Sequence, residues 1–195
     1  YGNIFPNLSL SWDKNLWSWQ LSYTMKTSRP GYNNLRNFMQ YDSRYLYEGG
    51  NPYLRPEYTY NVELSFEHKW LSASVDYDYV HKPMLHTFGL YDNQEIAYFS
   101  FHNMGHYQML SAAVTASPTF SWYQPSWEID YSQLFFREPT SLCSRHPSFT
   151  FVLRNSLVFP HGWMAGIDFY GYTDSYEPMR RTAGFVTMNA RLRKS

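Results

Sequence analysis

Apolar and polar residues alternate with a period of two along much of this chain, and this pattern constrains its fold more than any other feature. Between residues 17 and 25 the odd positions hold Trp, Trp, Leu, Tyr and Met, whereas the even positions hold Ser, Gln, Ser and Thr. The same alternation runs through residues 58–70 and 71–79. Since successive side chains of a β-strand point to opposite faces, the pattern predicts long strands with one apolar and one polar face.

Looser alternation elsewhere brings the number of predicted strands to nine. They cover residues 5–12, 17–25, 58–70, 71–79, 95–117, 122–136, 148–159, 163–173 and 184–194. Within the longest segment, its length and Gly105 predict a bulge or kink around residues 103–105. No segment shows the 3.6-residue period of a helix, so the predicted class is all-β.

The links between these strands alternate in length. Short links fall at residues 13–16, 69–71, 118–120 and 160–162, and long links at residues 26–57, 81–94, 137–147 and 174–183. Transmembrane β-barrels show this asymmetry, with short periplasmic turns and long extracellular loops. We therefore expect a segment of an antiparallel up-and-down transmembrane β-barrel with about nine strands.

The tryptophans cluster beside the short links. Five of the seven lie there, as expected for an aromatic girdle at a membrane–water boundary: Trp12, Trp17, Trp70, Trp122 and Trp163. A soluble β-sandwich whose tryptophans fill one end of its core would show a similar distribution, and the periodicity leaves this alternative open.

Composition excludes several other classes of protein. Aromatic residues make up 21% of the 195 residues and charged residues 16%, unlike a disordered chain. The 16 basic and 16 acidic residues balance, so nothing favours a nucleic-acid partner. No apolar run is long enough for a transmembrane helix.

Cys143 is the single cysteine, which precludes an intrachain disulfide, and we expect it to be a loop or wall residue. The chain begins without Met or a signal sequence, which we interpret as trimming.

The long link at residues 26–57 and the strand after it contain recognisable motifs. The sequence reads RPGYNNL at residues 29–35 and GNPYLRPEYTYNVEL at residues 50–64. This resembles the R-P-x-Y-x-x-L … G-N-P-x-L-x-P-E … Y-x-x-E-L stretch of TonB-dependent outer-membrane receptors, in the outer membrane protein beta-barrel family. The resemblance is most specific over residues 5–83. Its motif residues are Arg29, Pro30, Gly50, Asn51, Pro52, Leu54, Pro56 and Glu57.

The resemblance implies both an architecture and a function. Residues 1–195 would be part of one outer-membrane β-barrel domain, near its C-terminal end, with the plug, the earlier strands and the last hairpin not present. The protein would lie in the outer membrane of a Gram-negative bacterium and import a nutrient such as a siderophore, oligosaccharide or peptide. The implied partners are outer-membrane lipid, a periplasmic TonB-type energy-coupling system and a possible surface lipoprotein.

Two groups of residues are the binding candidates. Tyrosine and arginine offer stacking faces and hydrogen-bond donors, although in the long link they could equally serve to cover the barrel mouth. These substrate-binding candidates are Arg29, Tyr32, Arg36, Tyr41, Arg44, Tyr45, Tyr47 and Tyr53. Acidic residues on the polar faces are expected to face the lumen rather than to form a glycosidase pair. They are Glu63, Glu67, Asp76, Asp78, Glu128, Asp130 and Asp168.

No sequence motif indicates catalysis. His102 and His106 stand four residues apart, and His81 and His86 five apart, but neither pair has an evident third ligand. We expect no metal, no cofactor and no enzymatic activity. Two alternatives to the transporter remain at this point: a soluble secreted all-β carbohydrate-binding module, and a small passive outer-membrane pore or adhesin.

Overall fold

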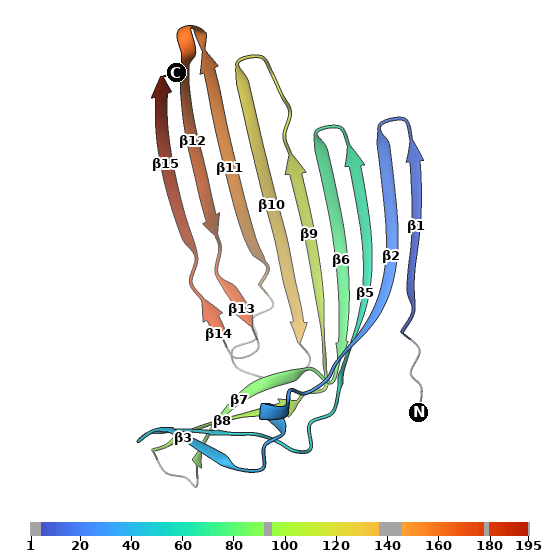
Figure 1. The fold of residues 1–195 in the computed structure, drawn as a ribbon, viewed down its shortest axis with the longest axis vertical. Helices are drawn as coiled ribbons and strands as arrows, with labels where there is room; N and C mark the ends of the chain where they lie inside the picture. The colour runs from blue at the N-terminus through green and yellow to red at the C-terminus, as the bar shows by residue number, and fades with distance from the viewer. Residues whose placement is uncertain (1–4, 92–94, 137–145, 178–179, 195) are drawn as a thin grey trace.

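Nine long strands form one antiparallel sheet in the computed structural model, which describes residues 5–91, 95–136, 146–177 and 180–194. Each strand pairs with the next one in this sheet, as an up-and-down arrangement requires (Figure 1). The strands are, in spatial order, β1 (Asn7–Lys14), β2 (Trp17–Ser28), β5 (Glu57–His68), β6 (Leu71–His81), β9 (His106–Ala116), β10 (Tyr123–Phe136), β11 (Ser148–Phe159), β12 (Trp163–Tyr172) and β15 (Phe185–Lys194).

The prediction of an all-β, up-and-down sheet is confirmed. Each predicted segment contributes one strand to the nine-stranded sheet. The four short links all lie at one end of this sheet and the long links at the other, as Figure 1 shows. The described residues also include two single-turn 3₁₀ helices, η1 (Tyr32–Leu35) and η3 (Pro160–Gly162). No helix within the described ranges is long and apolar enough to cross a membrane.

The prediction of nine strands in all was too low, because three of the long links contain further strands. A second sheet has the order β3 (Met39–Ser43), β4 (Leu46–Gly49), β8 (Ala97–Asn103) and β7 (Met84–Leu90). It lies across the long-link end of the nine-stranded sheet, and we call it the cap (Figure 1). A hairpin of β13 (Ser175–Glu177) and β14 (Arg180–Thr182) lies in the last long link. Cys143 and most of the link at residues 137–147 fall outside the described residues.

The predicted single strand at residues 95–117 was also wrong. Its first half is β8, which belongs to the cap, and its second half is β9, which belongs to the nine-stranded sheet. The chain turns between them, where Met104 N–H donates to the carbonyl of Pro83 at 3.0 Å and Lys82 N–H donates to that of Gly105 at 3.0 Å. The expected bulge or kink is therefore a corner at which the chain passes from one sheet to the other.

The nine-stranded sheet is a single layer with one apolar face. Leu10, Leu21, Leu64 and Val75 lie side by side across β1, β2, β5 and β6, and each is between 44% and 70% exposed. Within the described part of the chain, the buried hydrophobic core consists of Leu54 and Val80 alone. A soluble β-sandwich would cover such a face with a second sheet. In the described residues no second sheet does so.

The sheet is open, since β1 pairs with β2 alone and β15 with β12 alone. The strands therefore form a curved wall with two unpaired edges, and the described residues do not form a closed barrel.

Candidate functional site

The motif of the long link lies at the junction between the cap and the nine-stranded sheet. Asn51 N–H donates to the carbonyl of Asn34 at 2.6 Å, and Asn51 Nδ2 donates to the carbonyl of Phe101 at 3.0 Å. Its Oδ1 accepts from Tyr53 N–H at 3.0 Å, which closes a tight turn. The next motif residue, Leu54, is buried. Asn51 thus ties three chain segments together at one point.

Gly50 and Glu57 complete this junction. A Cβ on Gly50 would lie 2.6 Å from the backbone nitrogen of Arg36, so only glycine lets the two backbones approach this closely. The Glu57 carboxylate accepts from Met84 N–H at 3.0 Å and so connects β5 to β7. The other motif residues lie around the junction, with Arg29 and Pro52 exposed and Pro30 and Pro56 half-buried. In the structure, Asn51, Gly50 and Glu57 build the base of the cap.

Sequence reasoning missed Asn103, which bridges two loops. Its Oδ1 accepts from Arg55 N–H at 2.7 Å, and its Nδ2 donates to the carbonyls of Arg55 and Lys82, each at 2.9 Å. The only signal in the sequence was an asparagine two residues before Gly105. That signal predicted a kink and said nothing of the partners.

Four tyrosine rings form a row on one face of the cap, which we call the tyrosine cluster. The ring centroids are 5.4 Å apart for Tyr41 and Tyr47, 5.2 Å for Tyr47 and Tyr91, and 6.4 Å for Tyr91 and Tyr98. Tyr98 lies against Gly49, where a side chain would collide with its ring. Tyr91 comes from the next long link and Tyr98 from β8, and the parallel pairing of β4 with β8 brings them here. No local sequence signal marks this pairing.

The other binding candidates in the link are dispersed. Tyr32 and Tyr53 are 88% and 86% exposed. The Arg44 guanidinium lies 5.7 Å from the ring centroid of Tyr45, at the turn between β3 and β4. Arg36 instead has partners within the cap, because it donates to the carbonyl of Asn33 and to Gln40 Oε1, each at 2.8 Å, and lies 3.7 Å from the Glu48 carboxylate.

The seven acidic candidates share the polar face of the nine-stranded sheet, as the strand register shows. Glu63 lies directly opposite Asp76 on the neighbouring strand, and Asn61 Nδ2 donates to Asp78 Oδ1 at 2.9 Å. Asp168 lies opposite Arg154 and forms a 3.3 Å ion pair with Arg191. The polar face is therefore acidic over β5 and β6 and mixed in charge over β11, β12 and β15.

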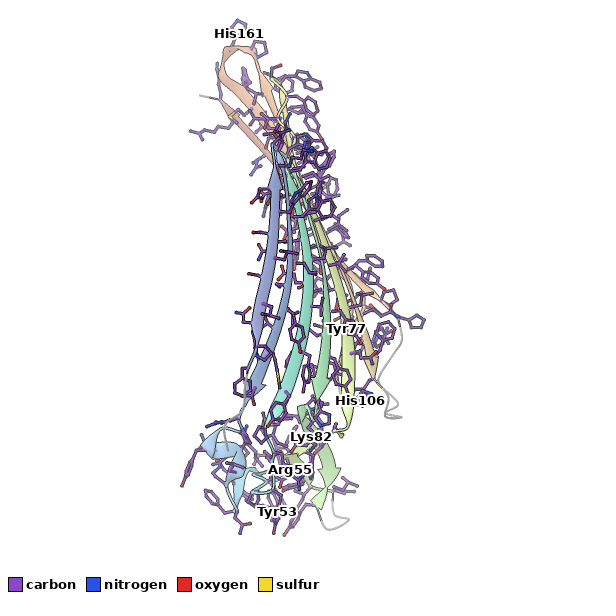
Figure 2. All side chains as sticks on the ribbon, turned by 90° about the vertical axis from the view of Figure 1, so that its right-hand side faces the viewer. Tyr53, Arg55, Tyr77, Lys82, His106 and His161 are labelled. Atoms are coloured by element: carbon purple, nitrogen blue, oxygen red, sulfur yellow. The ribbon has the colours of Figure 1, made fainter. Side chains whose placement is uncertain are left out.

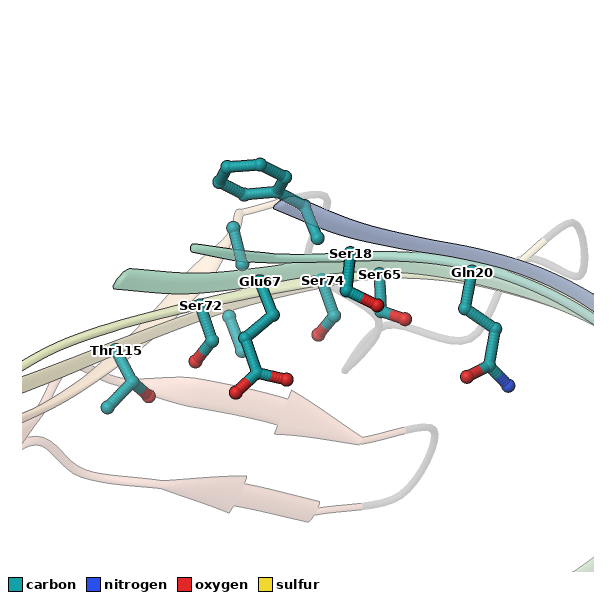
Figure 3. Close-up of a pocket in the computed structure, with 10 residues that line it drawn as sticks. Ser18, Gln20, Ser65, Glu67, Ser72, Ser74 and Thr115 are labelled. Atoms are coloured by element: carbon teal, nitrogen blue, oxygen red, sulfur yellow. The ribbon is translucent and has the colours of Figure 1, made fainter. Parts of the chain in front are cut away.

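A hydroxyl-rich hollow of about 250 Å³ lies on the polar face near the short links. Figure 3 shows the polar side chains that line it, all of which project from the same side of the sheet. They are Ser18, Gln20, Ser65, Glu67, Ser72, Ser74 and Thr115. Of the acidic candidates, only Glu67 lines this hollow.

A second hollow, of about 390 Å³, lies between the polar face and the long links. Tyr107, Met109 and Leu134 contribute to it from β9 and β10, and Leu85 and Tyr176 from the links. Sequence reasoning missed these residues. Their signal was a break in the alternation, because Tyr107, Met109 and Leu134 occupy positions of the polar face. An apolar side chain on the face that is otherwise polar departs from the alternation, and such a departure marks a candidate binding surface.

All five predicted girdle tryptophans lie at the short-link end and are 39–61% exposed. The structure adds Trp19, which lies directly opposite Trp12, and Trp127, which lies opposite Ala116. All seven tryptophans thus occupy the same half of the sheet.

The link between β12 and β15 contains a charged contact outside the long strands. The Asp174 carboxylate accepts from Gly184 N–H at 2.7 Å and from Arg181 at 2.6 Å. These two hydrogen bonds hold the pKa of Asp174 below its usual value. Among the described residues, no group of three His, Cys, Asp or Glu side chains is placed to hold a metal ion.

Comparison with known proteins agrees with this geometry. No curated protein gives a significant match. The sequence profile described as "Outer membrane protein beta-barrel family" matches residues 1–195, the whole of the chain. The single-layer sheet, its two contrasting faces and its alternating links are the features of such a barrel wall. The chain belongs to the outer membrane protein beta-barrel family.

Proposed function

We propose that this chain forms part of the barrel wall of an active transporter similar to TonB-dependent receptors, and that it imports a nutrient across the outer membrane of a Gram-negative bacterium. The observation that supports the proposal best is the nine-stranded single layer, with an uncovered apolar face on one side and a polar face on the other. In a membrane the first would contact lipid and the second a lumen.

Family membership supports the membrane location. An outer-membrane protein needs no second sheet over its apolar face, because lipid covers it. This removes the reason to prefer a soluble carbohydrate-binding module.

The two unpaired edges support a larger barrel. In lipid, the N–H and C=O groups of an open strand edge would have no hydrogen-bond partner, which costs several kcal/mol for each group. We infer that β1 and β15 pair with further strands in the membrane. These could form a barrel large enough to hold a plug, as in the receptors that the long link resembles.

The cap and the second hollow are the proposed substrate-facing surfaces. The tyrosine cluster offers flat rings for stacking and hydroxyl groups for hydrogen bonds, which suits sugars, catechols or peptides. The second hollow adds Tyr107 and Tyr176 beneath the long links, on the lumen side. A substrate moving from the cap into the lumen would meet both. A surface lipoprotein could cover the cap from outside.

Uptake by cells that express the complete protein tests this proposal. A panel of labelled ferric siderophores, oligosaccharides and peptides would identify a substrate, and uptake would then be repeated with a protonophore and in cells without the TonB-type system. An active transporter loses uptake under both conditions. A passive pore, the remaining alternative, keeps it, and an adhesin shows no uptake of any member of the panel.

Variants of the two surfaces refine the test. Tyr47→Ala removes the central ring of the tyrosine cluster, and Tyr107→Ala opens the second hollow. Each should lower uptake of the identified substrate, whereas Thr187→Ala, on the polar face but away from both surfaces, should not. Equal uptake by all three variants would remove these surfaces from the substrate path.

A further inference from the structure

A basic cleft of about 480 Å³ lies at the corner where the chain passes between the cap and the nine-stranded sheet. It is separate from the tyrosine cluster and from both hollows on the polar face. Its lining includes Tyr53, Arg55, His81, Lys82 and His102, and none of the residues that line it is acidic. The cleft therefore has two permanent positive charges and two histidines with no opposing carboxylate in its walls.

The cleft continues the apolar face of the sheet rather than the polar one. His81 ends the row of alternate positions that holds Val75, Tyr77 and Tyr79, so its side chain is on the apolar face. It lies directly opposite His106, whose ring is 5.3 Å from that of Tyr79. Figure 2 shows Tyr77, His106, Lys82, Arg55 and Tyr53 following one another from the sheet to the cap.

The backbone holds both cations in place. Lys82 has a φ of 54°, a left-handed conformation that costs a lysine roughly 1–2 kcal/mol. Its N–H donates to the carbonyl of Gly105 at 3.0 Å, and its carbonyl accepts from Asn103 at 2.9 Å. Asn103 also binds both the N–H and the carbonyl of Arg55. A single asparagine thus fixes the spacing of the two basic residues.

Neither cation is neutralised within the described structure. Three ion pairs form among the residues described, and neither Arg55 nor Lys82 takes part in any of them. Arg55 is exposed and Lys82 half-buried, so both can reach a ligand in the cleft. A tetrahedral phosphate is the anion that such a pair suits, since arginine binds it through two hydrogen bonds and lysine as a point charge.

We propose that the cleft binds the phosphate headgroup of an anionic lipid in the outer leaflet of the outer membrane. Its position is the observation that identifies a lipid. The acyl chains of a lipid bound there would lie along the exposed apolar face at Tyr77 and Val75, while its headgroup reached the cations. Aromatic side chains such as Tyr79 and Tyr53 suit this boundary between hydrocarbon and water. The inference rests on the proposed contact between lipid and the apolar face of the nine-stranded sheet. It is independent of what the protein transports.

Native mass spectrometry of the complete protein in dodecyl maltoside tests this site. The probes are diphosphoryl lipid A, phosphatidylcholine and inorganic phosphate at equal concentrations. The variants are Arg55→Gln and Lys82→Asn, because asparagine tolerates the left-handed backbone at residue 82. Arg44→Gln, which removes a cation of the cap that does not line the cleft, is the matched control.

We expect the wild-type protein to bind lipid A more tightly than either other probe, and this binding to weaken as salt rises. Each cleft variant should bind lipid A roughly fivefold less tightly, the usual effect of one basic side chain at an anionic surface. Arg44→Gln and the charge-conserving Lys82→Arg should bind like the wild type. All variants must show the heat-modifiable gel migration of the folded wild type.

Three results would overturn the proposal. They are unchanged lipid A binding by both cleft variants, equal binding of phosphatidylcholine, and displacement of lipid A by an equal concentration of inorganic phosphate. The last would identify free phosphate as the ligand. If the apolar face does not contact lipid, Leu64→Arg will not reduce assembly in the outer membrane more than Ser65→Arg does. That result does not depend on lipid A binding.

Discussion

The side chain of Asn103 hydrogen-bonds to both backbone groups of Arg55, accepting from its N–H at 2.7 Å and donating to its carbonyl at 2.9 Å. This pair of bonds reproduces the pattern that a neighbouring β-strand would offer. Asn103 is the last residue of β8 and pairs with Met84, so this pair of bonds forms at the point where the chain leaves the cap for β9.

Asn103→Ala should destabilise the junction between the cap and the nine-stranded sheet. The change removes three hydrogen bonds, two of them to the exposed Arg55 and one to the half-buried Lys82, and each such bond contributes about 0.5–1.5 kcal/mol where water can replace the lost partner. Urea unfolding of the protein in lipid vesicles measures the loss. Asn189→Ala, at an exposed position of the edge strand β15, is the control and should unfold like the wild type. Equal loss in both variants would show that the junction contributes little.

Gly50→Ala should prevent the cap from closing onto its base. The new Cβ would lie 2.6 Å from the backbone nitrogen of Arg36, and backbone cannot move aside as a flexible side chain can. We expect a cost of about 1–3 kcal/mol, typical of overpacking, and faster cleavage of the cap by trypsin. Gly89→Ala is the matched control within the cap, because no atom lies within 4 Å of its added Cβ. Equal cleavage of the two variants would contradict the close approach.

Leu64→Arg and Ser65→Arg compare the two faces of β5 at neighbouring residues. Leu64 is on the apolar face, between Leu21 and Val75, whereas Ser65 lines a hollow on the polar face. An arginine that faces the middle of a bilayer costs about 2–4 kcal/mol in such barrels. We therefore expect Leu64→Arg to reduce assembly in the outer membrane and Ser65→Arg to have little effect. The reverse order would place the lumen on the other side of the sheet.

The Asp174 carboxyl should titrate below its value in the unfolded chain, about 3.9 for an aspartate. Its bonds to Gly184 N–H and Arg181 favour the charged form and lower its pKa. The stability that this lowering gives is therefore fully present above pH 3.9 and is lost as the pH falls through the folded pKa. A ¹³C NMR titration of the carboxyl, in the folded and in the urea-unfolded protein, measures the difference.

Two variants separate the causes of this shift. Arg181→Gln should raise the Asp174 pKa only part of the way, because the hydrogen bond from Gly184, the largest single cause of the shift, remains. In Asp174→Asn the amide can still accept from Gly184 N–H but has no proton to gain, so the pH dependence should disappear. A folded carboxyl that titrates at the unfolded value would show that these contacts do not form.

The strands of the large sheet could be predicted because their signal is local. Each of β2, β5 and β6 presents one face to apolar surroundings and the other to polar surroundings. Apolar and polar residues therefore alternate along each strand, and this alternation is visible in the sequence. The short and long links follow from it. The same signal failed at β3, β4 and β7, which are short, face water in part and lack a sustained period, and it joined β8 to β9 as one strand.

The candidate site shows the same division. Tyr41 and Tyr47 could be chosen from sequence because they lie close together in one aromatic link. Tyr91 and Tyr98 reach them only through the parallel pairing of β4 with β8, between two links separated by β5 and β6. The second hollow was signalled by breaks in the alternation, such as Leu134, yet only the fold shows that these residues face Tyr176.

The sequence by itself determined that the chain is all-β, that its strands have two unlike faces, and that its tryptophans gather at the short links. These properties depend on neighbours within a few residues. The tertiary structure alone decided that no other described segment covers the apolar face, that Asn103 holds Arg55 and Lys82 at one corner, and that two distant links form one cap. These contacts join residues far apart in the chain. The hydrogen bonds that stabilise them form only when backbone groups of separate segments come together, so no local pattern predicts them.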